Sequence, residues 1–202
     1  SINEDAIAAV VGWPRVMGCV VTLGAGMYEP GHAQRTSGSD RDALTVGEPS
    51  GLLPQRLKSI SSVLGESFVT KTTANLWGER WAKLASNCMG NPAGAMSGLG
   101  SHGMADSSEA RLLKMNIAAE VVRVGMALNY HVESVSGVEA STWLDLSRGD
   151  VFEELDSRLR GKGRMDWHSS MSQDVIKGRR SEIDYLNGLV SNSGRDAGVP
   201  TP

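Results

Sequence analysis

Apolar positions follow two different patterns along the chain. Up to about residue 72, apolar runs of strand length alternate with helical spacing, whereas beyond residue 75 the spacing is helical only. We therefore expect an α/β segment over residues 1–72 and an all-α domain over residues 73–202.

The α/β segment is predicted to contain two helices and four strands. Asn3, followed by two acidic residues, is typical of a helix start, and Gly12-Trp13-Pro14 would end that helix. The apolar spacing over residues 52–64 predicts the second helix. Strands are expected at residues 16–23, 31–36, 43–47 and 67–72. The second and third strands should flank a turn rich in Ser, Gly and Asp, while Gly24 and Gly26 interrupt the chain after the first strand.

Five helices are predicted after residue 75. Their expected ranges are 75–89, 108–130, 138–146, 151–160 and 169–193. Asp106 and Ser107 are expected to cap the second of them. Pro92 should bend or end the first, because proline is poorly tolerated inside a helix.

Residues 98–103 match the motif G-x-G-x-x-G letter by letter, reading Gly-Leu-Gly-Ser-His-Gly. A dinucleotide-binding loop of this type follows a strand and opens a helix within a βαβ unit. Here a predicted helix precedes the motif and only helices follow it. We therefore interpret residues 98–103 as a loop between helices.

Lys83, Asn87 and Asn91 recur every four residues on one predicted helix. At 3.6 residues per turn they share one face, which is either a solvated polar face or the lining of a cleft. In a cleft the lysine could deliver a proton, and the amides could both donate and accept hydrogen bonds. Further on, Ser181 could cap a helix start in which Glu182 either serves the helix dipole or takes part in catalysis.

Composition and net charge argue against several classes of function. The 202 residues carry a formal net charge of −3, so nucleic acid is not an expected partner. The two cysteines fit a reducing, cytoplasmic compartment, and the four histidines have no metal-ligand spacing. No apolar run approaches the ~18 residues of a membrane span. The chain opens without an initiator Met, and we expect it to be part of a longer protein.

Two motifs together carry a family resemblance. They are Leu76-Trp77-x-x-x-Trp81-Ala82-Lys83-Leu84-x-x-Asn87-x-x-x-Asn91-Pro92, and Ser169-Ser170-Met171-x-x-Asp174 leading to Ser181-Glu182-Ile183-Asp184-x-x-Asn187-Gly188. In this order and spacing they resemble the ketopantoate reductase (2-dehydropantoate 2-reductase) family. The resemblance covers essentially the whole chain.

The resemblance implies a partial Rossmann domain over residues 1–72, lacking its first half, and a helical domain of the 6-phosphogluconate dehydrogenase type over residues 73–202. It implies NADPH-dependent reduction of 2-dehydropantoate to pantoate for pantothenate and coenzyme A biosynthesis, by a cytoplasmic homodimer. Lys83 would be the general acid. Glu182 would contact the nicotinamide end of NADP and help to place Lys83, and Gly24 would lie against the cofactor.

The resemblance also assigns the substrate site. Asn87 and Asn91 would hold the hydroxyl and carboxylate of the keto acid, and Ser170 would bind the carboxylate. Ser101 and Trp167 stand where the family has two further asparagines. These departures leave open a first alternative, the reductase of a different 2-keto acid, such as an opine or 3-hydroxyacid dehydrogenase. The long helix predicted over residues 108–130 and the missing half-domain leave open a second, a non-catalytic helical interaction module. Without the glycine-rich phosphate loop, the chain alone is expected to be inactive.

Overall fold

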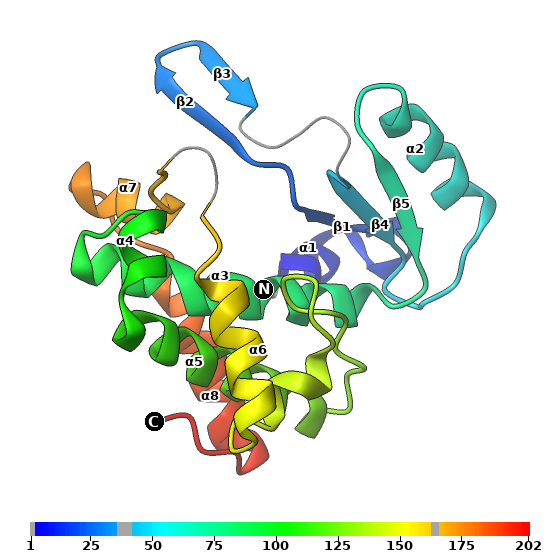
Figure 1. Ribbon diagram of the computed structural model, residues 1–202. Helices are drawn as coiled ribbons and strands as arrows, with labels where there is room; N and C mark the ends of the chain where they lie inside the picture. The colour runs from blue at the N-terminus through cyan, green and yellow to red at the C-terminus, as the bar shows by residue number, and fades with distance from the viewer. Residues whose placement is uncertain (1–2, 36–41, 163–165) are drawn as a thin grey trace. The chain divides into compact units, whose positions relative to one another are not determined.

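The structure is a computed structural model that describes residues 3–35, 42–162 and 166–202. The described residues divide into two compact units, one that ends at Arg80 and one over Trp81–Pro202 (Figure 1). The division falls inside helix α3 (Leu76–Ser97), a little beyond the boundary expected at residues 72–73. The first unit mixes strands and helices and the second is helical, as the apolar pattern predicts.

The elements of the N-terminal unit agree in place with most of the predicted ones. In chain order they are α1 (Asn3–Val11), the 3-10 turn η1 (Trp13–Arg15), β1 (Gly18–Val21), β2 (Ala25–Glu29), β3 (His32–Arg35), β4 (Leu44–Gly47), α2 (Gln55–Gly65) and β5 (Thr70–Thr73). The strand β2 is additional. The Ser-, Gly- and Asp-rich turn expected before residue 43 lies largely outside the described residues.

Three strands form one sheet in the order β1-β4-β5. The central strand β4 runs antiparallel to β1 and parallel to β5, and all four of its residues are buried. Helix α2 joins the two parallel strands and inserts Leu57, which is fully buried. A parallel pair joined by a crossover helix is the repeating unit of α/β nucleotide-binding folds.

The strands expected at residues 31–36 and 43–47 are present as β3 and β4, but they do not pair with each other. Instead, β3 pairs antiparallel with β2, while β4 joins the sheet. Gly24 and Gly26 suggested a break, yet Gly26 lies inside β2 opposite Gln34. Glycine weakens a strand but does not prevent one. Here a short turn connects β2 to β3, and the two strands pair.

The helical unit begins within α3 and contains α4 (Ser101–Asp106), α5 (Ser108–Ala127), η2 (Ala140–Leu144), α6 (Gly149–Leu159), α7 (Ser170–Ile176), η3 (Ile183–Tyr185) and α8 (Asn187–Ala197). The helix predicted over residues 138–146 is a shorter 3-10 helix. The helix predicted over residues 169–193 is wrong as one element, because Gly178, at a φ of 65°, follows the end of α7. Left-handed backbone of this kind ends helices.

Helix α5 lies at the centre of the helical unit. It contacts α4, α6, α8 and η2, and its Met115, Ala118 and Val122 are fully buried. The small side chain of Ala118 lets neighbouring helices approach closely, while the apolar area removed from water stabilises the unit. The predicted N-cap is confirmed at Ser107, whose side chain accepts a hydrogen bond from the Ala110 amide at 3.1 Å.

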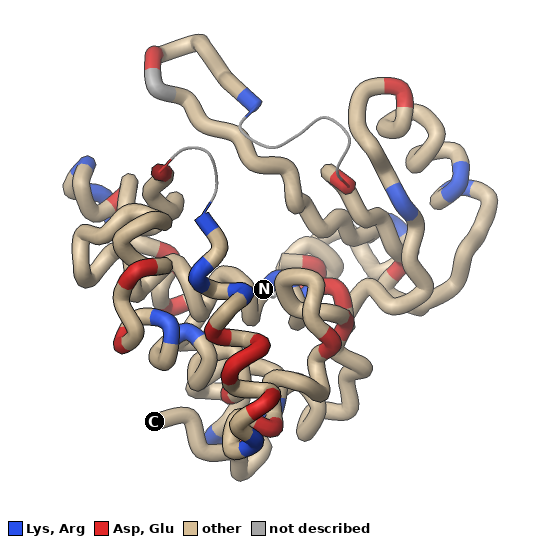
Figure 2. Tube along the Cα trace, viewed as in Figure 1, with Lys and Arg blue, Asp and Glu red and all other residues tan. Residues whose placement is uncertain are grey.

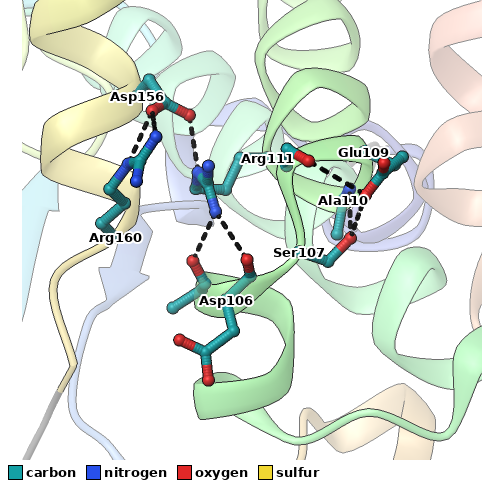
Figure 3. A network of polar contacts seen from close by, with 9 residues as sticks. Asp106, Ser107, Glu109, Ala110, Arg111, Asp156 and Arg160 are labelled. Atoms are coloured by element: carbon teal, nitrogen blue, oxygen red, sulfur yellow. Dashed lines mark hydrogen bonds and ion pairs between the residues drawn. The ribbon is translucent and has the colours of Figure 1, made fainter.

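The buried Arg111 of α5 forms hydrogen bonds that link α5 to α4 and α6 (Figure 3). Arg111 donates through Nη1 to the carbonyls of Ala105 at 2.7 Å and Asp106 at 3.0 Å, at the end of α4. Its Nε donates to Asp156 on α6 at 2.6 Å, and Arg160 donates to the second carboxylate oxygen at 2.7 Å. These hydrogen bonds hold the pKa of Asp156 below its usual range.

Charged residues of both signs are interspersed along the trace of both units (Figure 2). No helix in the described part of the chain is long and apolar enough to cross a membrane.

Candidate active site

Three polar side chains that the spacing assigns to one helical face lie on successive turns of α3. Lys83, Asn87 and Asn91 are each half-buried. Leu84 and Cys88, on the adjoining face, are buried in the helical core. A fully solvated polar face would leave the three side chains exposed. Their partial burial therefore favours the alternative in which they line a site.

The ammonium group of Lys83 forms no ion pair with any residue that the structure describes. Burial lowers the pKa of Lys83 from its ordinary value, because the charged form loses hydration. A lysine in this state gives up its proton more readily than one in water. It is suited to protonate an oxygen that gains negative charge during a reaction.

Helix α3 continues past Pro92 to Ser97, so the helix does not end at Asn91. Proline has no N–H for the carbonyl four residues earlier, which here belongs to Cys88. The side chain of Asn187, the first residue of α8, donates to that carbonyl at 3.3 Å. A donor from elsewhere in the fold thus compensates for the proline, and Asn91 stays within the helix.

Ser170 is the exposed first residue of α7, beside the turn of α3 that carries Asn91. The preceding residue, Ser169, is buried and caps α7 by accepting a hydrogen bond from the Ser172 amide at 3.1 Å. The Ser169 hydroxyl is also 3.4 Å from the main-chain oxygen of Asn91, to which it donates. The structure therefore brings Ser170 and Asn91 into one neighbourhood.

Ser101 begins α4, so the motif at residues 98–103 is only partly a loop. The helix before it, α3, agrees with rejection of a dinucleotide-binding motif. The Ser101 hydroxyl donates to Asp166 at 2.9 Å and accepts from the Trp167 amide at 3.1 Å. These partners hold Ser101 and Trp167, the two positions that depart from the family pattern, side by side.

Glu182 is exposed and directly precedes η3. Its main-chain oxygen accepts a hydrogen bond from the Tyr185 amide at 2.9 Å. No side chain caps η3, so the helix start predicted with Ser181 as its cap is wrong. Among the described residues, no hydrogen bond or ion pair joins Glu182 to Lys83.

Gly24 is half-buried in the link between β1 and β2 of the N-terminal unit. Between the end of β1 and this glycine, the amides of Thr22 and Leu23 both donate to the Ala43 carbonyl. The site residues of the helical unit and this glycine thus belong to different compact units.

Two long-range contacts at the site, and a half-buried lysine on α5, were not expected from the sequence. Asp166 and Asn187 act through contacts with residues 65 and 99 positions away, which no local pattern reveals. Lys114 on α5 is a second half-buried lysine with a pKa lowered by burial. Its position among apolar residues of the amphipathic helix α5 was the sequence signal that could have predicted this burial.

Cys88 is fully buried, and burial raises the pKa of its thiol to about 12. It is a core residue and not a thiolate nucleophile. Among the residues that the structure describes, no three His, Cys, Asp or Glu side chains gather into a metal-binding cluster. The chemistry available on α3 is proton donation by one lysine, with amide and hydroxyl groups nearby to orient a small polar molecule.

Residues 75–202 match a family model described as "Ketopantoate reductase PanE/ApbA C terminal". The chain is 27% identical over 193 residues to the 2-dehydropantoate 2-reductase of Pyrococcus horikoshii, an alignment that covers 93% of this chain and 56% of the relative. The chain spans about half the length of the curated relatives that it matches.

Solved structures show the same fold. The 2-dehydropantoate 2-reductase of Geobacter metallireducens has a TM-score of 0.76 at 22% identity, over 98% of this chain and 60% of that one. A D-mandelate dehydrogenase in complex with NADH has a TM-score of 0.77 at 22% identity, over 98% of this chain and 62% of that one. At this identity the similarity establishes the fold alone.

Proposed function

The chain belongs to the ketopantoate reductase family, and we propose that it carries the catalytic helices of an NADPH-dependent 2-dehydropantoate 2-reductase. The proposed reaction is reduction of the keto group of 2-dehydropantoate to pantoate, in the pathway to pantothenate and coenzyme A. Residues 73–202 would be the substrate-binding and catalytic domain. Residues 1–72 would be the second half of a Rossmann domain, a role supported by the parallel β4-α2-β5 crossover.

The half-buried ammonium of Lys83, which forms no ion pair with the described residues, is the observation on which this proposal rests. As the carbonyl carbon is reduced, negative charge develops on its oxygen. A nearby ammonium stabilises that charge and then supplies the proton. Because burial lowers the pKa of Lys83, the transfer needs less driving force than it would from a lysine in water.

Substrate orientation falls to the neighbouring polar groups. Asn87 and Asn91, on the next two turns of α3, would hold the hydroxyl and carboxylate of the keto acid. Ser170, placed beside Asn91 through the Ser169 hydrogen bond, would bind the carboxylate. An amide offers donors and an acceptor together, so it can orient both a hydroxyl and a carboxylate. Ser101 would border this site through its contact with Trp167.

The dinucleotide, when bound, supplies the hydride. From this chain, Glu182 and Gly24 would lie at its nicotinamide end. The only G-x-G-x-x-G in the sequence follows helix α3 and runs into α4, so it lacks the preceding strand of a pyrophosphate-binding loop. We therefore propose that the 202-residue chain alone binds the dinucleotide weakly and is inactive. The choice of NADPH over NADH, a homodimer and a cytoplasmic location belong to the same proposal.

The direct test is NADPH oxidation by the protein expressed from its complete reading frame, with 2-dehydropantoate as substrate. Lys83→Ala should lower kcat about a hundredfold or more, the usual contribution of a general acid. Lys58→Ala, which removes an exposed lysine of α2, serves as the matched control and should leave kcat unchanged. Turnover by the parent that survives Lys83→Ala would contradict the assigned acid.

A different 2-keto acid is the second candidate substrate. The observation that favours it is the hydrogen-bonded pair of Ser101 and Trp167, at positions where the family resemblance would place asparagines. Trp167 is 59% exposed, so its indole is available to a ligand. A panel of 2-keto acids with larger apolar side chains decides between the two. A higher kcat/KM for one of them than for 2-dehydropantoate would identify the alternative.

A further inference from the structure

Asp166 links the segment before α7 to the start of α4. Its Oδ1 accepts hydrogen bonds from the Ser101 hydroxyl at 2.9 Å and from the His102 amide at 2.8 Å. Gly100 makes room for this carboxylate, because a Cβ there would lie 2.4 Å from Oδ2 and 2.5 Å from Oδ1. One oxygen of the Asp166 carboxylate therefore accepts hydrogen bonds from two donors. The carboxylate lies against Gly100, where there is no space for a side chain.

Hydrogen bonds to the main chain tighten the same link. The Ser101 amide donates to the Trp167 carbonyl at 2.9 Å, and the Trp167 amide donates to the Ser101 hydroxyl at 3.1 Å. Together with the two bonds to Asp166, they make four hydrogen bonds between residues 101–102 and 166–167. We call this set the Asp166 clasp.

The other end of the segment is fastened to α3. Ser169 caps α7 and reaches the Asn91 carbonyl, as described above. A Cβ at Gly94, one turn after Asn91, would lie 3.1 Å from the Ser172 hydroxyl, so α7 packs closely on α3 at this point. Ser170 thus follows a short segment that is held at Asp166 and again at Ser169.

We propose that Asp166 is a positioning residue, which holds residues 166–169 on α4 so that Ser170 and Asn91 together meet the carboxylate of the keto acid. This inference rests on the proposed function. Asp166 itself need not touch the substrate, because both of its partners belong to the protein. Precise placement of a binding group matters because a displacement of about 1 Å weakens a preorganised site.

The charge state of Asp166 agrees with this role. The His102 amide and the Ser101 hydroxyl lower the pKa of its carboxyl group, so the side chain is an ionised, acceptor-only group at neutral pH. Hydrogen bonds to an ionised acceptor are stronger than those between neutral groups. Asparagine keeps one acceptor oxygen in the same place, whereas alanine removes it.

The experiment compares Asp166→Ala, Asp166→Asn and the control Glu153→Ala, which removes an exposed carboxylate of α6. Each is made in the protein expressed from its complete reading frame. Asp166→Ala should raise the KM for 2-dehydropantoate about tenfold, as expected for loss of one or two hydrogen bonds. The KM for NADPH and kcat should change less than about twofold, because Asp166 does not take part in the chemistry. Asp166→Asn should recover most of the loss.

Amide hydrogen exchange gives a readout that needs no turnover. Asp166→Ala should speed exchange at His102 and over residues 167–172, and leave residues 187–197 of α8 unchanged. Equal exchange in parent and variant overturns the inference. So does an Asp166→Ala variant in which general unfolding lowers kcat and raises both KM values together. A parent that does not reduce 2-dehydropantoate overturns the proposed function instead, and the exchange comparison then decides the positioning role by itself.

Discussion

Asn187 donates through Nδ2 to the main-chain oxygen of Cys88, at the point in α3 where Pro92 provides no N–H. The bond joins the start of α8 to the middle of the helix that carries Lys83, Asn87 and Asn91. A proline inside a helix leaves one carbonyl without its donor and clashes with it. The structure resolves the first problem with a side chain that is distant in sequence.

This relationship predicts a coupling between residues 92 and 187. Asn187→Ala should lower the free energy of unfolding by about 1 kcal/mol, because it leaves a buried carbonyl unpaired. Pro92→Ala restores the helical N–H, so the same asparagine substitution should then cost clearly less. Urea unfolding of the four variants measures the coupling. Equal costs in both backgrounds would show that Asn187 does not compensate for the proline.

The Arg111 network predicts a large loss of stability. Arg111→Met should lower the free energy of unfolding by about 3–5 kcal/mol, since it removes one partner of a buried ion pair. It leaves Asp156 with only the bond from Arg160, and two carbonyls at the end of α4 lose their donor. Arg158→Met, at an exposed ion pair with Glu154 on α6, is the control and should cost less than about 1 kcal/mol.

The same network predicts a dependence on acid. The pKa of Asp156 is depressed in the folded protein by Arg111 and Arg160. Its contribution to stability is therefore complete above the unfolded-state pKa of about 3.9, and is lost as the pH falls through the lower folded-state pKa. Thermal unfolding from neutral pH into this range should show the loss in the parent and a shallower slope in Arg111→Met. Parallel slopes would be evidence against the assignment.

The pKa of Lys83 gives a prediction for the reaction. Its lowered value means that the protonated acid disappears at a lower pH than for a free lysine, whose pKa is about 10.4. We expect kcat/KM for 2-dehydropantoate reduction to fall with rising pH, with a midpoint below that value. Lys83→Arg should retain weak activity without this alkaline fall, because a guanidinium keeps its proton. A midpoint that is unchanged in Lys83→Arg would assign the titration to another group.

Lys114 predicts a gain in stability. It is half-buried with a pKa lowered by burial, so folding disfavours its charged form. Lys114→Met should raise the free energy of unfolding by about 1 kcal/mol at a pH below the lowered folded-state pKa, where the charged form is buried on folding. The gain should shrink as the pH rises from the lowered folded pKa to the unfolded one, because the penalty then vanishes. Denaturant melts at neutral and alkaline pH make the comparison.

The sequence predicted well the elements in which one local signal dominates. The apolar spacing of α5 and the cap at Ser107 are confirmed, as is a short helix that begins at Asn3. The pairing of β2 with β3 was missed, because strand partners are chosen by tertiary contacts that Gly24 and Gly26 do not reveal. The path of α3 through Pro92 was missed for a similar reason, since its compensating donor is Asn187.

For the site, helical periodicity placed Lys83, Asn87 and Asn91 on one face but could not give their burial. Burial depends on what packs beside α3, and that includes α7, which begins beyond residue 169. The Asp166 clasp joins residues 65 positions apart, so no motif of short range contains it. The roles of Glu182 and Gly24 remain predictions carried by the family resemblance.

The burial of Cys88 has a practical consequence. A thiol with a pKa of about 12, directly after Asn87 and inside the helical core, is almost entirely protonated and shielded at neutral pH. A thiol-labelling reagent can modify it only when α3 separates from its neighbours. The labelling rate at Cys88 therefore reports local opening of α3, the helix that carries Lys83, and the measurement needs no added probe.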